Sequence, residues 1–300
     1  MSEIFKSYGI NGTIAFELSD RNGTDFFQKS LEENIRFAKT HQQKQVKGMI
    51  GLHALFTLSD QSLQKIAENT NNFPIHVHIA EGEIDEIQSK EKYGITIIER
   101  LNKFGLLRNN SLLVHCSNIN EKEIDILKTK NIFIVQALDS NLNNALNIGN
   151  ISKFIDAGIK TTVGTDGMTS NIMKAYKNTF IFTKYQNKTP DIGYPEMNAL
   201  FLNSFKLKKV FGFPIGIIEE EPADIAIFDY EPATPFNTDK FLDHFIFGIT
   251  ESFAQYVIKN DVLLLDDYHL TKNLYPNLFA RSKEISKAMF KKFEANKGRY

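Results

Sequence analysis

Residues 74–82 read PIHVHIAEG, and this stretch decides how the rest of the chain is interpreted. His76 and His78 stand two positions apart, so on an extended strand both imidazoles face the same side. The stretch predicts a β-strand over 74–80. It also raises the question of whether these two histidines are the pair of metal ligands of a hydrolase.

The stretch belongs to a regular alternation of short apolar runs and longer amphipathic segments, which is typical of βα units and a parallel sheet. We predict strands at 11–18, 46–56, 74–80, 111–117, 131–137 and 160–166. A helix is expected after each strand, at 24–41, 59–70, 83–104, 119–129, 146–157 and 168–186.

The alternation stops near residue 190. Residues 195–212 predict one more helix, and the apolar runs at 223–230, 244–249 and 254–265 predict β-structure, the last as a hairpin across Asn260-Asp261. A closing helix is expected over 273–298. The chain therefore carries a small β unit after its main α/β part.

Composition restricts the class of protein. The 300 residues are 42 % hydrophobic and 24 % charged, as in a globular protein, and the formal net charge of −1 gives no general attraction to nucleic acid or anionic membrane. We therefore expect neither partner. A single cysteine, Cys116, excludes an internal disulfide and fits a reducing compartment, and no apolar run approaches the ~20 residues of a membrane span. A cytoplasmic protein is expected.

Polar side chains gather near the carboxyl ends of the predicted strands: His53, His78, His115 and Asp166. In a parallel barrel, side chains from that end of the strands converge on the active site. Imidazole nitrogens and carboxylate oxygens are ligands that zinc accepts, and catalytic zinc keeps a position open for water. Taken singly, each histidine is better explained as a hydrogen-bonded core or loop residue, whereas His78, His115 and Asp166 together, each at the end of a different strand, favour a functional site.

Glu81 follows His78 by three residues, just past the strand end. A carboxylate there is placed for general acid–base work, although a carboxylate favoured by the helix dipole is the competing explanation. Cys116 is expected to pack away from the site, because neighbours on a strand face opposite sides. His41, His244 and His269 are expected to have surface or loop roles.

The stretches HIAE at 78–81, HC at 115–116 and GTDG at 164–167, followed by PADIAIFDY at 222–230, resemble the amidohydrolase superfamily. Within it the chain resembles the deaminase/chlorohydrolase-like branch, which includes cytosine, guanine and methylthioadenosine deaminases, and most of all the aminohydrolase group called SsnA. The likeness runs along almost the whole chain through GLHALFTLSD (51–60), ERLNKFGLL (99–107) and NEKEIDIL (120–127).

The resemblance implies an α/β fold, an incomplete (β/α)8 TIM-type barrel consisting of strands three to eight with a partial flanking β-sandwich. It places the barrel portion at 1–208, the sandwich at 209–272 and a C-terminal helix at 273–300. It implies a divalent metal, zinc or else iron, with His78 and Asp166 as ligands and His115 binding the metal or orienting its water. Glu81 would shuttle protons, Asp166 would also take a proton from water, and His53 would contact the substrate.

Two departures from the family pattern matter. The His-x-His pair of the first barrel strand, which supplies two ligands, precedes the segment matched by 11–18, so the ligand set is incomplete here. The loop after the predicted strand 131–137 usually resembles His-Asn-Pro-x-Ser-Asn, whereas residues 136–141 read QALDSN. Ser140 and Asn141 are retained, and the resemblance assigns them to the substrate pocket.

Six strands cannot close an eight-stranded barrel, so the first and last strands are expected to present open edges. We therefore expect a homo-oligomer or a companion N-terminal chain. His76 is not expected to substitute for a missing ligand, since two residues along a strand separate its Cα from that of His78 by ~6.5 Å.

Three interpretations stay open on the sequence. The first is a metal-dependent aminohydrolase that hydrolyses a C–N bond of a small nitrogenous, heterocyclic substrate. The second is a catalytically inactive fragment or pseudoenzyme that acts as an interaction scaffold. The third is an α/β binding protein whose strand-end histidines contact an anion or a sugar.

Overall fold

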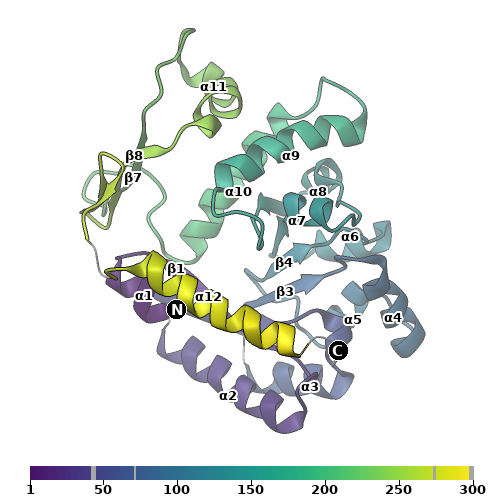
Figure 1. Ribbon diagram of the computed structural model, residues 1–300. Coiled ribbons are helices and arrows are strands. Elements are labelled where there is room, and N and C mark those ends of the chain that lie inside the picture. The colour runs from purple at the N-terminus through teal and green to yellow at the C-terminus, as the bar shows by residue number, and fades with distance from the viewer. Residues whose placement is uncertain (42–44, 71, 273–274, 297–300) are drawn as a thin grey trace.

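A parallel sheet of six strands forms the centre of the protein (Figure 1), whose computed structural model describes residues 1–41, 45–70, 72–272 and 275–296. The strands are β1 (Gly12–Leu18), β2 (Val46–Leu52), β3 (Ile75–Ile79), β4 (Leu112–His115), β5 (Phe133–Gln136) and β6 (Lys160–Val163). Their order in the sheet is their order in the chain. All six predicted strands are confirmed, and so is the open sheet: among the described strands, β1 pairs only with β2 and β6 only with β5.

Helices surround the sheet in Figure 1, from α2 and α3 at the bottom to α9 and α10 at the top. Their bounds are α1 (Ser2–Ser7), α2 (Thr24–Thr40), α3 (Asp60–Asn69), α4 (Glu83–Tyr93), α5 (Ile97–Lys103), α6 (Glu121–Leu127), α7 (Leu138–Asn143), α8 (Ile151–Asp156), α9 (Ile172–Asn187) and α10 (Tyr194–Val210). Neither α1 nor α7 was predicted.

The single helix predicted over 83–104 is wrong, because the chain forms α4 and α5 instead. Gly94 ends α4 in the left-handed region at φ 73°, where glycine has no side chain to clash. Thr96 then starts α5 with a capping box, in which its side chain accepts from the Glu99 amide and the Glu99 carboxylate accepts from the Thr96 amide.

Along β3, fully buried aliphatic residues alternate with partly buried histidines. Ile75, Val77 and Ile79 are fully buried in the main apolar cluster, which joins the strands to the surrounding helices. His76 and His78 are only partly buried and lie on the other face of the strand. The burial of three large aliphatic side chains on one face therefore fixes the two histidines on the inner face of the sheet.

A second, antiparallel sheet follows the helices, in the order β10-β9-β8-β7. Its strands are β7 (Asp224–Phe228), β8 (Ala254–Lys259), β9 (Val262–Asp266) and β10 (His269–Leu270). The predicted hairpin is confirmed, with Asn260 and Asp261 both at positive φ between β8 and β9, as a type I′ turn requires.

The predicted β-structure at 244–249 is wrong: these residues lie in α11 (Phe241–Phe247) and at the start of a 3₁₀ turn at Ile249–Glu251. Phe245 and Ile246 are buried in a second apolar cluster with side chains of α9 and α10. Two further 3₁₀ turns lie at Leu55–Thr57 and Thr238–Lys240. The chain closes with α12 (Leu278–Ala295), none of whose residues is buried, and within the described residues we find no helix suited to crossing a bilayer.

The close approach of β1 and β2 generates a stability prediction. A Cβ atom at Gly51 in β2 would lie 2.4 Å from the carbonyl oxygen of Phe16 in β1, which is backbone and cannot give way. We expect Gly51→Ala to lower the free energy of unfolding by about 1–3 kcal/mol, as overpacking does. Urea unfolding followed by circular dichroism measures the change.

Gly216→Ala is the matched control, because the nearest atom to its added Cβ would be 3.9 Å away. Equal unfolding midpoints for the Gly51 and Gly216 variants would contradict the packing described for these two strands.

Candidate metal centre

Three polar side chains meet where β3 and β4 end. The register of this pair places Ile79 opposite His115, so that His78 and Glu81 from one strand end reach His115 on the next. One nitrogen or oxygen atom from each of His78, Glu81 and His115 lies within 4.8 Å of the others. The Nε2 atom of His115 is 3.7 Å from Oε2 of Glu81, and the two imidazole rings lie 5.1 Å apart, edge to face.

The backbone is strained at the ends of these strands. Ala80, His115, Cys116 and Asp166 are non-glycine residues with φ of 50°, 73°, 52° and 48°. Such left-handed residues cost energy, and they persist where the surrounding structure holds them, which is often at functional sites. Here Gln136, buried at the end of β5, donates a side-chain hydrogen bond to the carbonyl of His115 and so stabilises the turn.

Cys116 packs away from this group, as predicted. It is fully buried in the main apolar cluster, and burial raises the pKa of its thiol far above the ordinary value. A thiol that stays protonated is a poor nucleophile. The strand end therefore presents the imidazole of His115, not the sulfur, to the site.

The imidazole of His115 has one satisfied and one unsatisfied nitrogen. Nδ1 lies 2.8 Å from Oδ1 of Asn141, whereas Nε2 is buried and has no hydrogen-bond partner among the described residues. Buried polar atoms are nearly always paired, so an orphaned one indicates a group that the protein alone does not supply.

These residues fit a divalent metal ion. Imidazole nitrogen and carboxylate oxygen are the donors that zinc takes, and three protein donors leave a position open, as in catalytic sites. His78, Glu81 and His115 would hold the ion. Burial, with the nearby His115, lowers the pKa of His78, which favours the neutral imidazole that ligates metals.

His76 lies beside this group without belonging to it. Its ring is 5.6 Å from that of His78, and burial lowers its pKa to about 4, so the imidazole is neutral near pH 7. It is not among the three residues whose donor atoms meet. That His76 does not bind metal stays a prediction.

Asp166 lies just past the end of β6 and belongs to the same region. A hydrogen bond with the Ser140 side chain holds its pKa below the ordinary value, and the nearby His78 and His115 lower it further. The three donors within 4.8 Å include Glu81, however, in the place that the sequence assigned to Asp166. The role of Asp166 as a ligand therefore stays a prediction.

The backbone of Glu81 is held from both sides by residues that sequence reasoning missed. Its N–H donates to Oδ2 of Asp85, and its carbonyl accepts from Nδ2 of Asn118 at 2.9 Å. Asn118 follows His115 by three positions, the same spacing as Glu81 after His78, and this parallel was a usable signal. The carboxylate itself is part-exposed and stays available for chemistry.

The three predicted substrate contacts differ in position. His53 follows β2, is partly exposed, and hydrogen-bonds Thr57 through Nδ1 at 3.1 Å; burial lowers its pKa, and the carboxylates of Glu17 and, more weakly, Glu81 oppose the shift. Ser140 and Asn141 are buried, and they bond Asp166 and His115 instead of facing open space. Their contact with a substrate stays a prediction.

Two histidines that were expected to have surface or loop roles are buried. His41 stacks on Phe37 with ring centres 3.9 Å apart, and His244 hydrogen-bonds the hydroxyl of Tyr230 at 2.7 Å. His41 lies in the turn after α2, in agreement with a loop role, whereas His244 lies within α11 and its ring packs against Tyr230, so the expectation for His244 was wrong. His269 is exposed, as expected.

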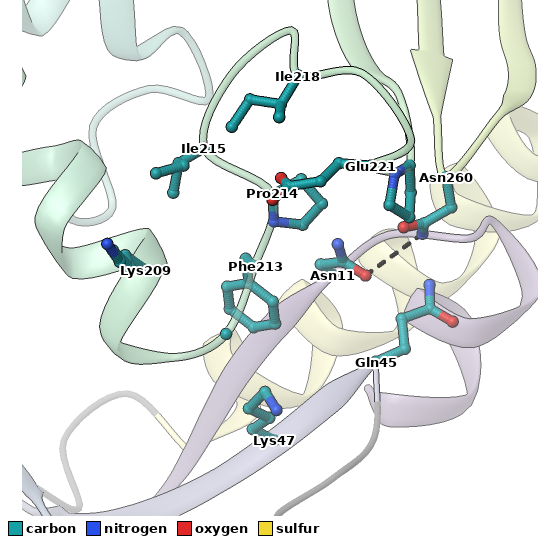
Figure 2. A pocket seen from close by; sticks show the side chains of 12 residues that line it. Asn11, Gln45, Lys47, Lys209, Phe213, Pro214, Ile215, Ile218, Glu221 and Asn260 are labelled. Carbon is teal, nitrogen blue, oxygen red and sulfur yellow. Dashed lines mark hydrogen bonds between the residues drawn. The ribbon is translucent and has the colours of Figure 1, made fainter.

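A large cavity, of 810 Å³, lies away from this group (Figure 2). Asn11 and Lys47 line it from the amino-terminal ends of β1 and β2, opposite the strand ends that carry the histidines. Its other wall is formed by Phe213 and neighbouring residues of the 212–222 loop, and Asn260 bonds Asn11 across it at 3.3 Å. The group of His78, Glu81 and His115 and this cavity therefore lie at opposite ends of the sheet.

The parallel sheet carries its donor side chains at the carboxyl ends of its strands, where α/β proteins of the barrel type have their active sites. The protein therefore belongs to the class of α/β proteins of the barrel type. Comparison with known families then identifies the group: the profile of the Amidohydrolase family matches residues 1–260, and the chain belongs to this family. The predicted superfamily and fold are thereby confirmed. The likeness to the SsnA group stays a prediction.

Deaminases are among the relatives. The chain is 36 % identical over 174 residues to 5'-deoxyadenosine deaminase of Methanococcus maripaludis, a match that covers 54 % of this chain and 40 % of the relative. It is 24 % identical over 281 residues to 5-methylthioadenosine/S-adenosylhomocysteine deaminase of Dictyoglomus thermophilum, covering 90 % of this chain and 65 % of the relative. The matches thus span at most about two thirds of these curated relatives.

A solved structure shows the same fold. The adenosine deaminase from Xanthomonas campestris with bound zinc aligns with a TM-score of 0.82 and 18 % identity, over 96 % of this chain and 68 % of that one. At this identity the likeness shows the fold alone.

The geometry of the three donors predicts which variants lose metal. We expect the purified protein to bind zinc, and both His78→Ala and His115→Ala to weaken that binding at least tenfold, because each removes a ligand. Competition with a chromophoric chelator measures the affinity. His76→Ala is the matched control on the same strand face, and it should bind zinc as the unchanged protein does. A loss in His76→Ala equal to that in His78→Ala would contradict the assignment.

Proposed function

We propose that this chain carries the metal centre of an aminohydrolase that removes the amino group from a small purine-like heterocycle. The observation that carries the proposal is the meeting of His78, Glu81 and His115 around a buried imidazole nitrogen that has no hydrogen-bond partner in the described part of the chain. The names of the relatives, which are deaminases of adenosine-type nucleosides, support the substrate class.

The reaction needs one proton to travel from water to the leaving nitrogen, because hydrolysis replaces the ring amino group by oxygen and releases ammonia. A zinc ion, when bound, would polarise reacting groups and lower the pKa of water. Glu81 would hold the ion through one carboxylate oxygen and carry the proton on the other: the carboxylate is part-exposed, lies 3.7 Å from Nε2 of His115, and stands on a backbone held at both its N–H and its carbonyl.

Asp166 and His53 complete the proposed site. The hydrogen bond with Ser140 lowers the pKa of Asp166, so this carboxylate is able to accept the proton that water loses, and Glu81 would then carry that proton to the leaving nitrogen. His53, partly exposed just after β2, is proposed to contact the substrate ring.

Full activity, on this proposal, belongs to an assembly. The sheet leaves β1 and β6 each with one described neighbour, and α12 exposes Phe279, Phe290 and Phe293 to 84 %, 59 % and 61 %. Open edges and exposed apolar faces favour association. A second copy of the chain or a companion polypeptide would cover them. We propose a reducing, cytoplasmic location from the single buried cysteine.

The open sheet also favours a second candidate, a catalytically inactive protein that uses the same strand ends to bind a small molecule or another protein. Gln136 supports this candidate, because it occupies the position where the family pattern has a histidine, and its side chain is occupied by the His115 carbonyl.

Turnover of 5'-deoxyadenosine separates the two candidates. We expect the zinc-loaded protein to release ammonia from this nucleoside, and Glu81→Gln, compared at equal bound zinc, to lower kcat by about 10²–10⁴-fold because the proton carrier is lost. Glu91→Gln, an exposed glutamate on α4, is the matched control and should keep full activity. If zinc binds but neither 5'-deoxyadenosine nor adenosine nor guanine is turned over, the inactive candidate replaces this proposal.

A further inference from the structure

The hydrogen bond between Asn141 and His115 has a consequence for the site. Both side chains are buried, with exposed fractions of 2 % and 0 %, and Nδ1 of His115 lies 2.8 Å from Oδ1 of Asn141. We infer that Asn141 is a positioning residue that fixes the tautomer of His115, so that the lone pair of Nε2 faces His78 and Glu81. The inference deepens the proposed function and rests on it, because fixing the tautomer matters only if His115 binds the metal.

The orientation of the Asn141 amide follows from its other partners. Its Nδ2 atom lies 2.8 Å from the backbone carbonyl of Asn147 and 3.1 Å from Oγ of Ser117. A backbone carbonyl only accepts hydrogen bonds, so the atom facing it must be the amide nitrogen. The amide oxygen therefore faces His115, and a flipped amide would set oxygen against oxygen.

The proton of His115 is then placed by elimination. An amide oxygen only accepts, so Nδ1 must carry the hydrogen and donate it. In a neutral imidazole one nitrogen is a donor and the other an acceptor, which leaves the lone pair on Nε2. This is the buried nitrogen without a described partner, 3.7 Å from Glu81. Without Asn141, nothing in these contacts would keep the hydrogen on Nδ1.

The support for Asn141 extends to the segment that carries Glu81. Nδ2 of Asn147 donates to Oδ1 of Asn118 at 2.6 Å and to Oε1 of Glu83 at 3.0 Å. Nδ2 of Asn118 in turn donates to the carbonyl of Glu81. One chain of amide groups thus joins the imidazole of His115 to the backbone of Glu81. Both groups are held in place by the protein, before any ion binds.

A structural role alone is the alternative, in which Asn141 only fills its buried position. The two differ in one observable, the tautomer of His115, which packing alone does not determine. Long-range ¹H–¹⁵N spectra of metal-free protein labelled with [¹⁵N]histidine report which ring nitrogen carries hydrogen. His115→Ala identifies the signal. We expect the Nδ1–H form in the unchanged protein.

Variants of Asn141 complete the test. Asn141→Leu removes the acceptor at similar volume, and we expect a shift toward the Nε2–H form and a 10–100-fold loss of zinc affinity. Asn141→Asp keeps an acceptor and should retain the Nδ1–H form and zinc affinity within a few-fold. Asn143→Leu, an exposed amide on the same short helix, is the matched control and should change neither.

An Nε2–H form in the unchanged protein would overturn the inference, and this result needs no variant to fold. An unaltered tautomer and zinc affinity in Asn141→Leu would overturn it as well. If the unchanged protein shows the Nδ1–H form and binds zinc but turns over no nucleoside, the proposed function fails while the inference on Asn141 stands.

Discussion

The pairing of β3 with β4 is the constraint on which the site depends. Val77 pairs with Leu113 and Ile79 with His115, and the aliphatic residues of β3 are buried against the helices. A shift of one residue would turn this aliphatic face toward the inside and the histidines into the core. The hydrophobic outer face of the sheet therefore holds the polar groups of its inner face in place.

Strained turns and buried hydrogen bonds then hold the side chains at the strand ends in position. The left-handed residues at Ala80, His115 and Asp166 bend the chain just where each strand ends. Gln136 donates a hydrogen bond to the carbonyl of His115, and Asn118 donates one to the carbonyl of Glu81. Asn141 bonds the imidazole of His115. Such satisfied buried networks are rigid, which is what a metal centre or a proton carrier requires.

Much of this was predictable from the sequence. The six strands follow from the alternation of apolar runs, and His78 and His115 follow from polar residues at strand ends, whereas Glu81 was predicted as a proton carrier and not as a metal donor. The predicted domain boundary at 208 falls in the last turn of α10, which ends at Val210.

The rest depends on properties that a single sequence does not display. Which carboxylate lies beside the two histidines depends on the three-dimensional course of the chain after each strand, and in the structure Glu81 lies within 4.8 Å of both. The resemblance assigned Asn141 to the substrate pocket, and its hydrogen bond with His115 was not predictable because 26 positions separate the two residues and no local pattern links them. The run at 244–249 was too short to distinguish a buried helix from a strand.

Anomalous diffraction at the zinc absorption edge, from crystals grown with zinc, tests the central claim most directly. The account predicts one strong peak at the ends of β3 and β4, about 2.0–2.2 Å from donor atoms of His78, Glu81 and His115. A zinc-containing crystal without a peak at these three residues, or with one bound by His76 in place of His115, would contradict it.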